Sequence, residues 1–356
     1  MNSSTSASKL VLALALAGFL FVLANMLVAW RMPALLANSP LFDAFELERR
    51  VAACPAKGQV RVVVLGNSHG LAGMRPDLLA RHLGVPAATI FNLCLKGANA
   101  RETLMIARRF LPQFPAAAVA PIFVDELLVG QAWAEEPRMR YRSRFDVAER
   151  LAMLPWHDDT DRRFGLLVGA AVPMFDQGEL LRTALGSQPR RFLVALATGE
   201  AALTPGSPNA LVHAAPYAWG FPPVWDVPGF FGASRLAAPF TPGGVRQRAL
   251  QITRQLEKAP LGFDDLEACC AYLEARGVRP LLVQTPIYDG LSQRLRQPPF
   301  AQAEAAYLAA LGGFLTTTRR TVRNRPGTMP RALFFDEDHL NRAGADAFTR
   351  WLAGQL

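Results

Sequence analysis

The chain has 356 residues, of which 51% are hydrophobic and 19% are charged, and its formal net charge is +9. This length allows one large or two ordinary domains and excludes the small scaffolds that depend on disulfides or metals for stability. The composition also excludes a disordered chain. Despite the positive charge, no segment has the pattern of a nucleic-acid-binding module, so we expect no nucleic-acid partner.

An uncharged segment near the N-terminus predicts one membrane span. No residue from 10 to 30 carries a charge, and at about 1.5 Å per residue this segment reaches about 31 Å, close to the hydrocarbon thickness of a bilayer. A cleaved secretory signal usually has an apolar core of about 7 to 15 residues, so we favour a retained anchor over residues 1–31. The flanking charges do not decide its orientation. No second segment is long enough to cross a membrane, which excludes a polytopic transporter.

A connector is predicted at residues 32–59, where Pro33, Pro40 and Pro55 are expected to interrupt any long helix. The β-branched run at 60–65 then predicts a strand buried on both faces, as in a parallel sheet. Strand and helix patterns alternate after it. The further predicted elements are a helix at 76–83, a strand at 88–93, a helix at 99–110 and a strand at 116–124.

The alternation stops between about 130 and 260, which we interpret as an insertion. Its aromatic stretch at 217–231 forms either a satellite core or a surface that meets lipid or a partner. The alternation then resumes and predicts a three-layer α/β/α domain over residues 60–356, with a doubly wound parallel sheet. The later elements are a helix at 263–276 ended by Gly277, a strand at 279–284, a helix at 301–315, a strand at 332–335 and a closing helix at 342–352.

Residues that directly follow the strands are the first candidates for a site, because open α/β sheets bind ligands outside the carboxyl ends of their strands. The first strand is followed by Gly66-Asn67-Ser68-His69-Gly70. This tight turn presents Ser68 as a candidate nucleophile. Two alternatives are a serine that only caps a helix and a glycine-rich turn that holds a phosphate.

The last predicted strand is followed by Asp336-Glu337-Asp338-His339, which places a histidine and a carboxylate at the same edge of the sheet. A serine hydroxyl becomes a good nucleophile when an imidazole accepts its proton, and the imidazole needs a carboxylate to orient it. Three residues of separation on a turn let Asp336 reach the far ring nitrogen of His339. Ser68, His339 and Asp336 are therefore the predicted catalytic residues.

With these motifs the sequence resembles the SGNH, or GDSL-like, hydrolase superfamily. The resemblance rests on GNSHG at 66–70, FNLCLKGAN at 91–99 and DEDHLNRAG at 336–344. It implies that Ser68 is the nucleophile, His339 the base and Asp336 its orienting acid. It also implies an oxyanion hole, for which the backbone N–H groups of Ser68 and Gly97 are the candidates.

The sequence departs from the family pattern at two positions. Asn67 stands where the family usually has an aspartate, and Asp125 follows the third strand, where a Gly-x-Asn would supply the remaining oxyanion donor. An ionised carboxylate cannot donate a hydrogen bond. Asn99 is a candidate replacement, while Asn67 and His69 are expected to line the pocket.

The anchor, the insertion and the closing Asp-x-x-His together resemble those superfamily members that acylate extracellular polymers. Examples are proteins of alginate acetylation and of teichoic acid D-alanylation, which act with a polytopic membrane-bound O-acyltransferase. The resemblance implies a single-pass protein of the inner membrane with its catalytic domain on the periplasmic side. It also implies a serine O-acyltransferase, transferring an acyl group such as acetyl to a polysaccharide or another cell-envelope polymer, with no cofactor and no metal.

Two other functions fit the same sequence. An SGNH carbohydrate esterase would use the identical triad, with water as the acceptor of the acyl group. A non-catalytic protein would instead bind the polymer or act as a scaffold for the acyltransferase, and the absent Gly-x-Asn favours this second alternative.

Overall fold

The computed structural model describes residues 3–37, 42–130, 151, 154, 160–172, 178–201, 203–214, 241–257, 261–323 and 328–356. The chain divides into two compact units. One contains Met1–Phe45 and Arg140–Pro205, and the other contains Glu46–Met139 and Gly206–Leu356. The aromatic stretch at 217–231 lies outside the described residues.

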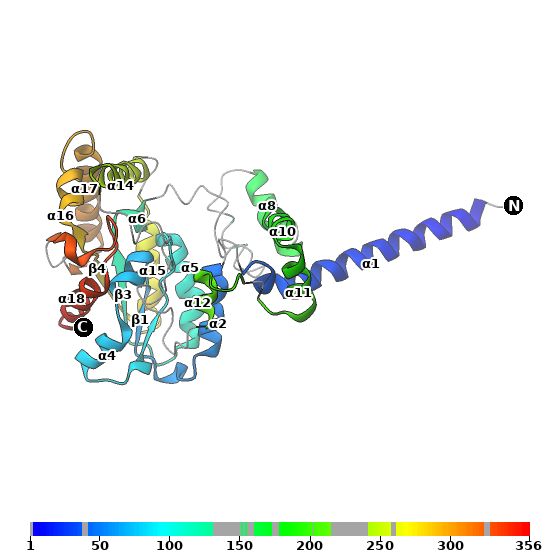
Figure 1. The fold of residues 1–356 in the computed structure, drawn as a ribbon, viewed down its shortest axis with the longest axis horizontal. Coiled ribbons are helices and arrows are strands. Elements are labelled where there is room, and N and C mark those ends of the chain that lie inside the picture. Colours follow the sequence, from blue (N-terminus) through cyan, green and yellow to red (C-terminus); the bar gives the residue numbers. More distant parts are fainter. Residues whose placement is uncertain are drawn as a thin grey trace. The chain divides into compact units, whose positions relative to one another are not determined.

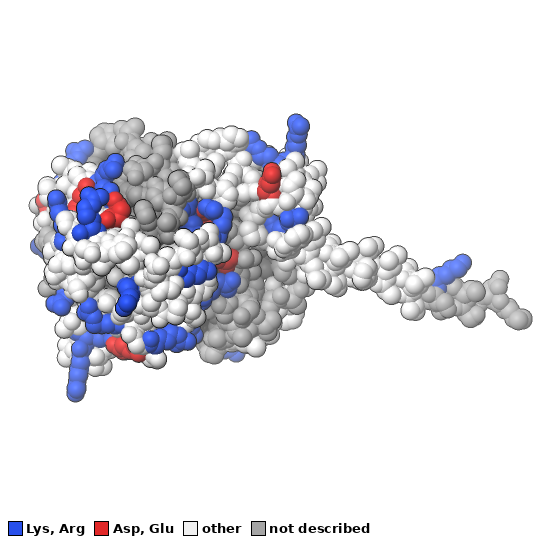
Figure 2. Space-filling model, turned by 90° about the horizontal axis from the view of Figure 1, so that it is seen from below, with Lys and Arg blue, Asp and Glu red and all other residues white. Residues whose placement is uncertain are grey.

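The first unit is built on one long helix, α1 (Ser3–Leu35). Within it, Lys9–Leu35 is long and apolar enough to span a membrane or to serve as a signal sequence. Large apolar side chains are exposed along this helix, which projects as a long rod in Figure 1, and no charged residue lies between Lys9 and Arg31 (Figure 2). Pro33, which was expected to interrupt any long helix, lies within α1, and the helix ends two residues after it at Leu35.

Helices from the predicted insertion, for which the sequence analysis proposed no individual elements, complete this unit. They are α8 (Thr160–Ala171), α10 (Gly178–Ser187) and α11 (Pro189–Thr198). α11 packs against both α1 and α10. Their shared apolar cluster includes Met32, Leu35, Leu181 and Ala195. α2 (Phe42–Ala53) leads from this unit into the second.

The second unit contains a five-stranded sheet in the order β2-β1-β3-β4-β6, and all its paired strands are parallel. The predicted parallel α/β sheet is therefore confirmed. Val63 of β1 pairs with Phe91 of β2, and Val119 of β3 pairs with Arg279 of β4. A separate two-stranded sheet joins β5 and β7. The strands are β1 (Val62–Val64), β2 (Ile90–Asn92), β3 (Val119–Val124), β4 (Arg279–Gln284), β5 (Ile287–Tyr288), β6 (Val322–Arg323) and β7 (Thr328–Met329).

The helices of this unit form packed groups, in which α18 contacts α3 and α4 while α5 contacts α15. Several of their ends follow from the sequence: Gly84 ends α4 in a left-handed conformation, and Asn99 with Glu102 forms a capping box at the start of α5. The helices are α3 (Ser68–Gly73), α4 (Pro76–Leu83), α5 (Ala100–Phe110), α6 (Glu126–Val129), α12 (Pro208–Ala214), α14 (Pro242–Leu256), α15 (Phe263–Glu274), α16 (Asp289–Leu295), α17 (Ala301–Thr318) and α18 (Arg342–Ala353), with short 3-10 turns at Lys57–Gln59, Ala87–Thr89, Leu111–Gln113 and Arg331–Leu333.

The predicted last strand at 332–335 is wrong. Arg331–Leu333 forms a 3-10 turn, and Phe334 makes only an isolated bridge to Leu340. The chain doubles back on itself here, because the N–H of Phe335 donates to the carbonyl of His339 at 3.1 Å. The fifth strand of the sheet is instead β6, whose two residues are too few to give a period-2 pattern in the sequence.

Phe348 of α18 connects the helices to the sheet. Its side chain is fully buried, and its ring lies 5.7 Å from that of Phe123 in β3. We expect Phe348→Ala to lower the free energy of unfolding by about 3–5 kcal/mol, because it leaves a cavity between α18 and β3. Leu308→Ala on the exposed face of α17 is the matched control, with an expected change within about 0.5 kcal/mol. Chemical denaturation of the detergent-solubilised full chain measures both, and equal losses would contradict this packing.

Candidate active site

Ser68 is the first residue of α3, directly after β1 and the turn at Gly66 and Asn67. Gly66 has φ +139°, and a Cβ at this position would lie 3.0 Å from Cβ of Phe123, so the turn requires glycine. The side chain of Asn67 caps α3 by accepting a hydrogen bond from the N–H of His69 at 2.9 Å. These contacts fix Ser68 at the carboxyl end of the sheet's first strand.

The loop before α18 is held by its own carboxylate. Oδ1 of Asp336 accepts hydrogen bonds from the N–H groups of Asp338 at 3.1 Å and His339 at 2.7 Å. Two residues further on, Asn341 caps α18 through the N–H of Gly344. The position of the His339 ring is therefore set by the backbone of the loop that carries it.

The structure brings the three predicted catalytic residues together. Oγ of Ser68 lies 2.9 Å from Nε2 of His339, although the two residues are 271 positions apart. Nδ1 of His339 lies 3.0 Å from each carboxylate oxygen of Asp336. Since carboxylate oxygens surround Nδ1, the neutral ring carries its proton there and leaves Nε2 free to accept the proton of Ser68. All three side chains are buried.

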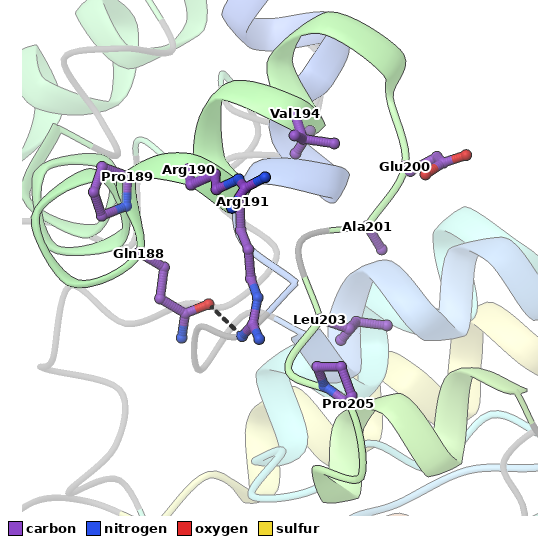
Figure 3. Close-up of a pocket in the computed structure, with 10 residues that line it drawn as sticks. Gln188, Pro189, Arg190, Arg191, Val194, Glu200, Ala201, Leu203 and Pro205 are labelled. Carbon is purple, nitrogen blue, oxygen red and sulfur yellow. Dashed lines mark hydrogen bonds between the residues drawn. The ribbon is translucent and has the colours of Figure 1, made fainter.

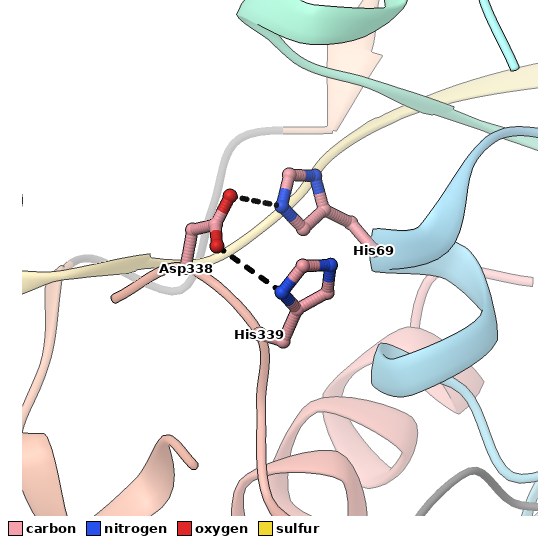
Figure 4. A group of neighbouring side chains, drawn as sticks. All are labelled: His69, Asp338 and His339. Atoms are coloured by element: carbon pink, nitrogen blue, oxygen red, sulfur yellow. Dashed lines mark hydrogen bonds and ion pairs between the residues drawn. The ribbon is translucent and has the colours of Figure 1, made fainter. Parts of the chain in front are cut away.

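Further charged residues surround this group: His69, which was expected to line the pocket, and Asp125, Asp338 and Arg248, for which the sequence predicted no part in a charge network. Nδ1 of His69 contacts Oδ2 of Asp125 at 2.7 Å, and Nε2 of His69 contacts Oδ2 of Asp338 at 3.0 Å. The other oxygen of Asp338 lies 3.1 Å from Nδ1 of His339, so Asp338 lies beside the two histidine rings and bridges them (Figure 4). Arg248 of α14 donates through Nε to Asp338 at 2.7 Å and pairs with it through a second nitrogen.

These contacts make His69 a buried cation. Burial alone would lower its pKa, but the charges and hydrogen bonds of Asp125 and Asp338 outweigh burial and raise the pKa to about 10. Both ring nitrogens then donate to carboxylates. In the same way, burial would raise the pKa of Asp125, but His69 lowers it overall, so this carboxylate stays ionised.

The charge around His339 is also unusual for a base. Burial would lower its pKa, but the carboxylates of Asp338 and Asp336 raise it above the ordinary value of 6.5. Asp338 itself is fully buried, and although burial would raise its pKa, Arg248 and the histidines hold that pKa well below the usual range. The carboxylates of Asp125, Asp336 and Asp338 are thus each paired with a histidine or with Arg248.

The structure also bears on the expected oxyanion donors. Asp125 accepts hydrogen bonds from Asn67 and from the N–H groups of Leu127 and Leu128, so it caps α6 as an ionised acceptor and does not donate. Oδ1 of Asn99 accepts a hydrogen bond from the N–H of Glu102, so this oxygen caps α5.

Gly97 lies in the turn after β2, with φ +70°. The N–H of Leu95 in this turn donates to the carbonyl of Gly66 at 3.0 Å, so the turn lies against the loop that carries Ser68. The backbone N–H groups of Ser68 and Gly97 stay the predicted oxyanion donors.

His69, Asp338 and His339 also form the group of side chains that could hold a metal ion, since their ligand atoms lie within 4.8 Å of one another. The donor set argues for ion pairing instead. Arg248 and protonated His69 already neutralise Asp338, and Nδ1 of His339 faces Asp336. A cation at this point would have to displace these partners.

In comparisons with known proteins, no family model matches this chain and no curated protein matches it. The case for its function therefore depends on the arrangement of its own residues.

His69 offers a direct test of the buried charge network. We expect His69→Gln to destabilise the protein by about 3–5 kcal/mol near pH 6, because it removes a buried cation from between two carboxylates. A group whose pKa is raised by folding stabilises fully below its unfolded pKa of about 6.5 and loses that effect as the pH rises towards 10. Denaturation of wild type and variant from pH 6 to 10 measures the difference. If the difference in the free energy of unfolding between wild type and variant does not decrease as the pH rises, the ion pairs of His69 are contradicted.

Proposed function

We propose that this protein is a membrane-anchored serine O-acyltransferase that acts through an acyl-Ser68 intermediate. The observation that carries the proposal is the line of contacts from Ser68 through His339 to Asp336, with 2.9 Å and 3.0 Å between successive heavy atoms. This is the arrangement that acyl transfer by a serine requires. The resemblance to SGNH hydrolases, with a doubly wound sheet whose first strand precedes the serine, supports the same conclusion.

In the first half-reaction, Oγ of Ser68 attacks the carbonyl carbon of an acyl donor while Nε2 of His339 takes the hydroxyl proton. The tetrahedral intermediate places its negative oxygen at the N–H groups of Ser68 and Gly97. Each donor aimed at such an oxygen contributes about 3–4 kcal/mol in acyl transfer. The bond to the leaving group then breaks, the leaving group takes the proton from His339, and the acyl group stays as an ester on Ser68.

In the second half-reaction, a hydroxyl group of the acceptor polymer loses its proton to Nε2 of His339 and attacks the acyl-Ser68 ester. The new ester forms, the bond to Ser68 breaks, and His339 returns the proton to Oγ of Ser68. Asp336 keeps the ring in the required tautomer and stabilises its charged form in both halves.

His69 and Asp338 act as positioning residues in this proposal. Asp338 contacts both histidine rings, one through each of its carboxylate oxygens, so that His69 holds the carboxylate that faces His339. The ring of His69 lies 4.8 Å from that of His339, centre to centre. A fixed cation at this distance limits how far the two carboxylates can raise the basicity of His339.

The anchor supports transfer to a polymer outside the cytoplasm. The apolar length of α1 suits a single inner-membrane span, and the resemblance favours a periplasmic catalytic unit that works with a polytopic membrane-bound O-acyltransferase. The acceptor in this proposal is a polysaccharide or another cell-envelope polymer. A carbohydrate esterase is the second candidate, because water can replace the acceptor hydroxyl at the same triad.

Replacing the nucleophile tests the enzyme proposal. We expect Ser68→Ala to reduce both acyl transfer and ester hydrolysis by about 10⁴-fold or more, because it removes the hydroxyl that lies beside Nε2 of His339. Ser187→Ala, at an exposed serine of α10, is the matched control and should keep full activity. Acetyl release from an activated ester, followed with and without a soluble polysaccharide, separates transfer from hydrolysis. Full activity in Ser68→Ala would support the non-catalytic scaffold instead.

The pH dependence tests the role of His339 as a base. Since the carboxylates raise its pKa, we expect kcat/KM to rise with pH through a midpoint above the ordinary 6.5. Asp338→Asn removes one of these charges and should shift the midpoint to lower pH. Asp346→Asn, at a half-exposed residue paired with Arg75, should leave it in place. A midpoint that is unchanged in Asp338→Asn would show that another group titrates.

A further inference from the structure

α11 exposes an apolar face although it belongs to a packed unit. The side chains of Leu193 and Val194 are 59% and 48% exposed, and Leu185 of the neighbouring α10 is 43% exposed. Large apolar side chains gathered on one surface typically mark a place of contact with lipid or protein.

The opposite face of α11 is fixed to α1. Ala195 is completely buried in the cluster that includes Met32 and Leu35. Nη2 of Arg31 also donates to the carbonyl of Ala197 at 3.3 Å, which ties the last turn of α11 to α1. The exposed leucine and valine are therefore held at a defined level along α1.

That level is the end of the membrane-spanning part of α1. About 20 helical residues cross a hydrocarbon core of about 30 Å, so a span that begins at Leu10 ends near Trp30. Trp30 is 69% exposed, and the guanidinium of Arg31 lies 3.8 Å from the centre of its ring. Tryptophan and arginine are typical of the membrane–water interface. The cluster on which α11 packs includes Met32 and Leu35, which follow this pair, and Val28, which lies just before it.

The first turn of α11 adds positive charge and a hollow of about 580 Å³ (Figure 3). Arg190 and Arg191 line it together with Val194, Leu203 and Pro205. Arg191 is held by hydrogen bonds to Gln188 at 3.1 Å and to Thr204 at 2.8 Å. Apolar walls beside guanidinium groups match a phospholipid, which joins acyl chains to a phosphate.

We propose that α11 docks on the bilayer surface, with Leu193 and Val194 at the boundary between headgroups and acyl chains and with Arg190 and Arg191 at lipid phosphates. The occupant is lipid because the apolar face continues the lipid-facing surface of α1 at the level where the span ends. This inference rests on the proposed membrane anchoring of α1 and is independent of the chemistry at Ser68. In this proposal the first unit lies on the membrane surface around α1, which anchors it.

Site-specific fluorescence quenching tests the docking. All four native cysteines are buried, so an introduced surface cysteine can be labelled selectively. The full-length variants Leu193→Cys, Phe19→Cys and Leu308→Cys each receive an environment-sensitive fluorophore and are reconstituted into vesicles of phosphatidylcholine with brominated acyl chains. Phe19 is 63% exposed in the middle of α1 and reports on the anchor. Leu308 is 49% exposed on α17 and is the matched control for an exposed leucine.

We expect the bromine to quench the labels at positions 193 and 19 and to leave the label at 308 bright. A bright label at 193 beside a quenched label at 19 would overturn the docking and leave the anchor in place, whether water or a protein partner covers α11. A bright label at 19 would overturn the anchor and the docking together.

The phosphate contacts have their own test. Adding phosphatidylglycerol to the vesicles should increase the quenching at 193, and Arg190→Gln with Arg191→Gln should remove that increase. An increase that survives in the double variant would overturn the assignment of these two arginines to lipid phosphates.

Discussion

The buried imidazolium of His69 joins segments that are far apart in the sequence. Its two ring nitrogens bind Asp125, which follows β3, and Asp338, in the loop before α18. Asp338 in turn binds Arg248 of α14. A buried charge without a partner is costly, so within the folded protein each group in this chain of contacts strongly favours the paired arrangement over one that breaks a pair. The loop that carries His339 is thereby fixed beside Ser68.

This constraint also sets the chemistry of the site. The carboxylates of Asp336 and Asp338 both approach Nδ1 of His339, and without the cations His69 and Arg248 they would raise the pKa of this imidazole further. Because Asp338 is paired with two cations, it raises the pKa of His339 by less than an unpaired carboxylate would. His69, the residue next to Ser68, thus acts through its charge. Arg248 lies on α14, in the region that the sequence shows only as an insertion.

The parts of the fold that could be predicted have strong local signals. The helix at 76–83 and the strand at 279–284 match α4 and β4, because an N-terminal proline with a capping glycine and a continuous apolar run are local patterns. The proximity of Ser68, His339 and Asp336 was also predicted. Ser68 follows β1, as expected from the rule that sites lie at the ends of strands, but the strand expected before His339 is a 3-10 turn, so the rule does not account for that residue.

The features of the fold and site that the sequence did not predict depend on tertiary contacts. Arg248 has no sequence signal, because its role comes from a contact with a residue 90 positions away. Asp125 follows a predicted strand and could have been placed at the site, but its ionised state depends on His69 and Asn67. β6 is too short to show a pattern, and α11 lies in a region without strand and helix alternation.

Covalent labelling by a fluorophosphonate probe tests the central claim most directly, because the probe reacts with a serine whose proton is removed by a neighbouring base. Peptide mass spectrometry of the full chain then identifies the modified residue. The account predicts modification at Ser68 in the wild type and its loss in His339→Ala, with the four buried cysteines unmodified. Modification at another serine, or equal modification of Ser68 in the absence of the His339 ring, would contradict it.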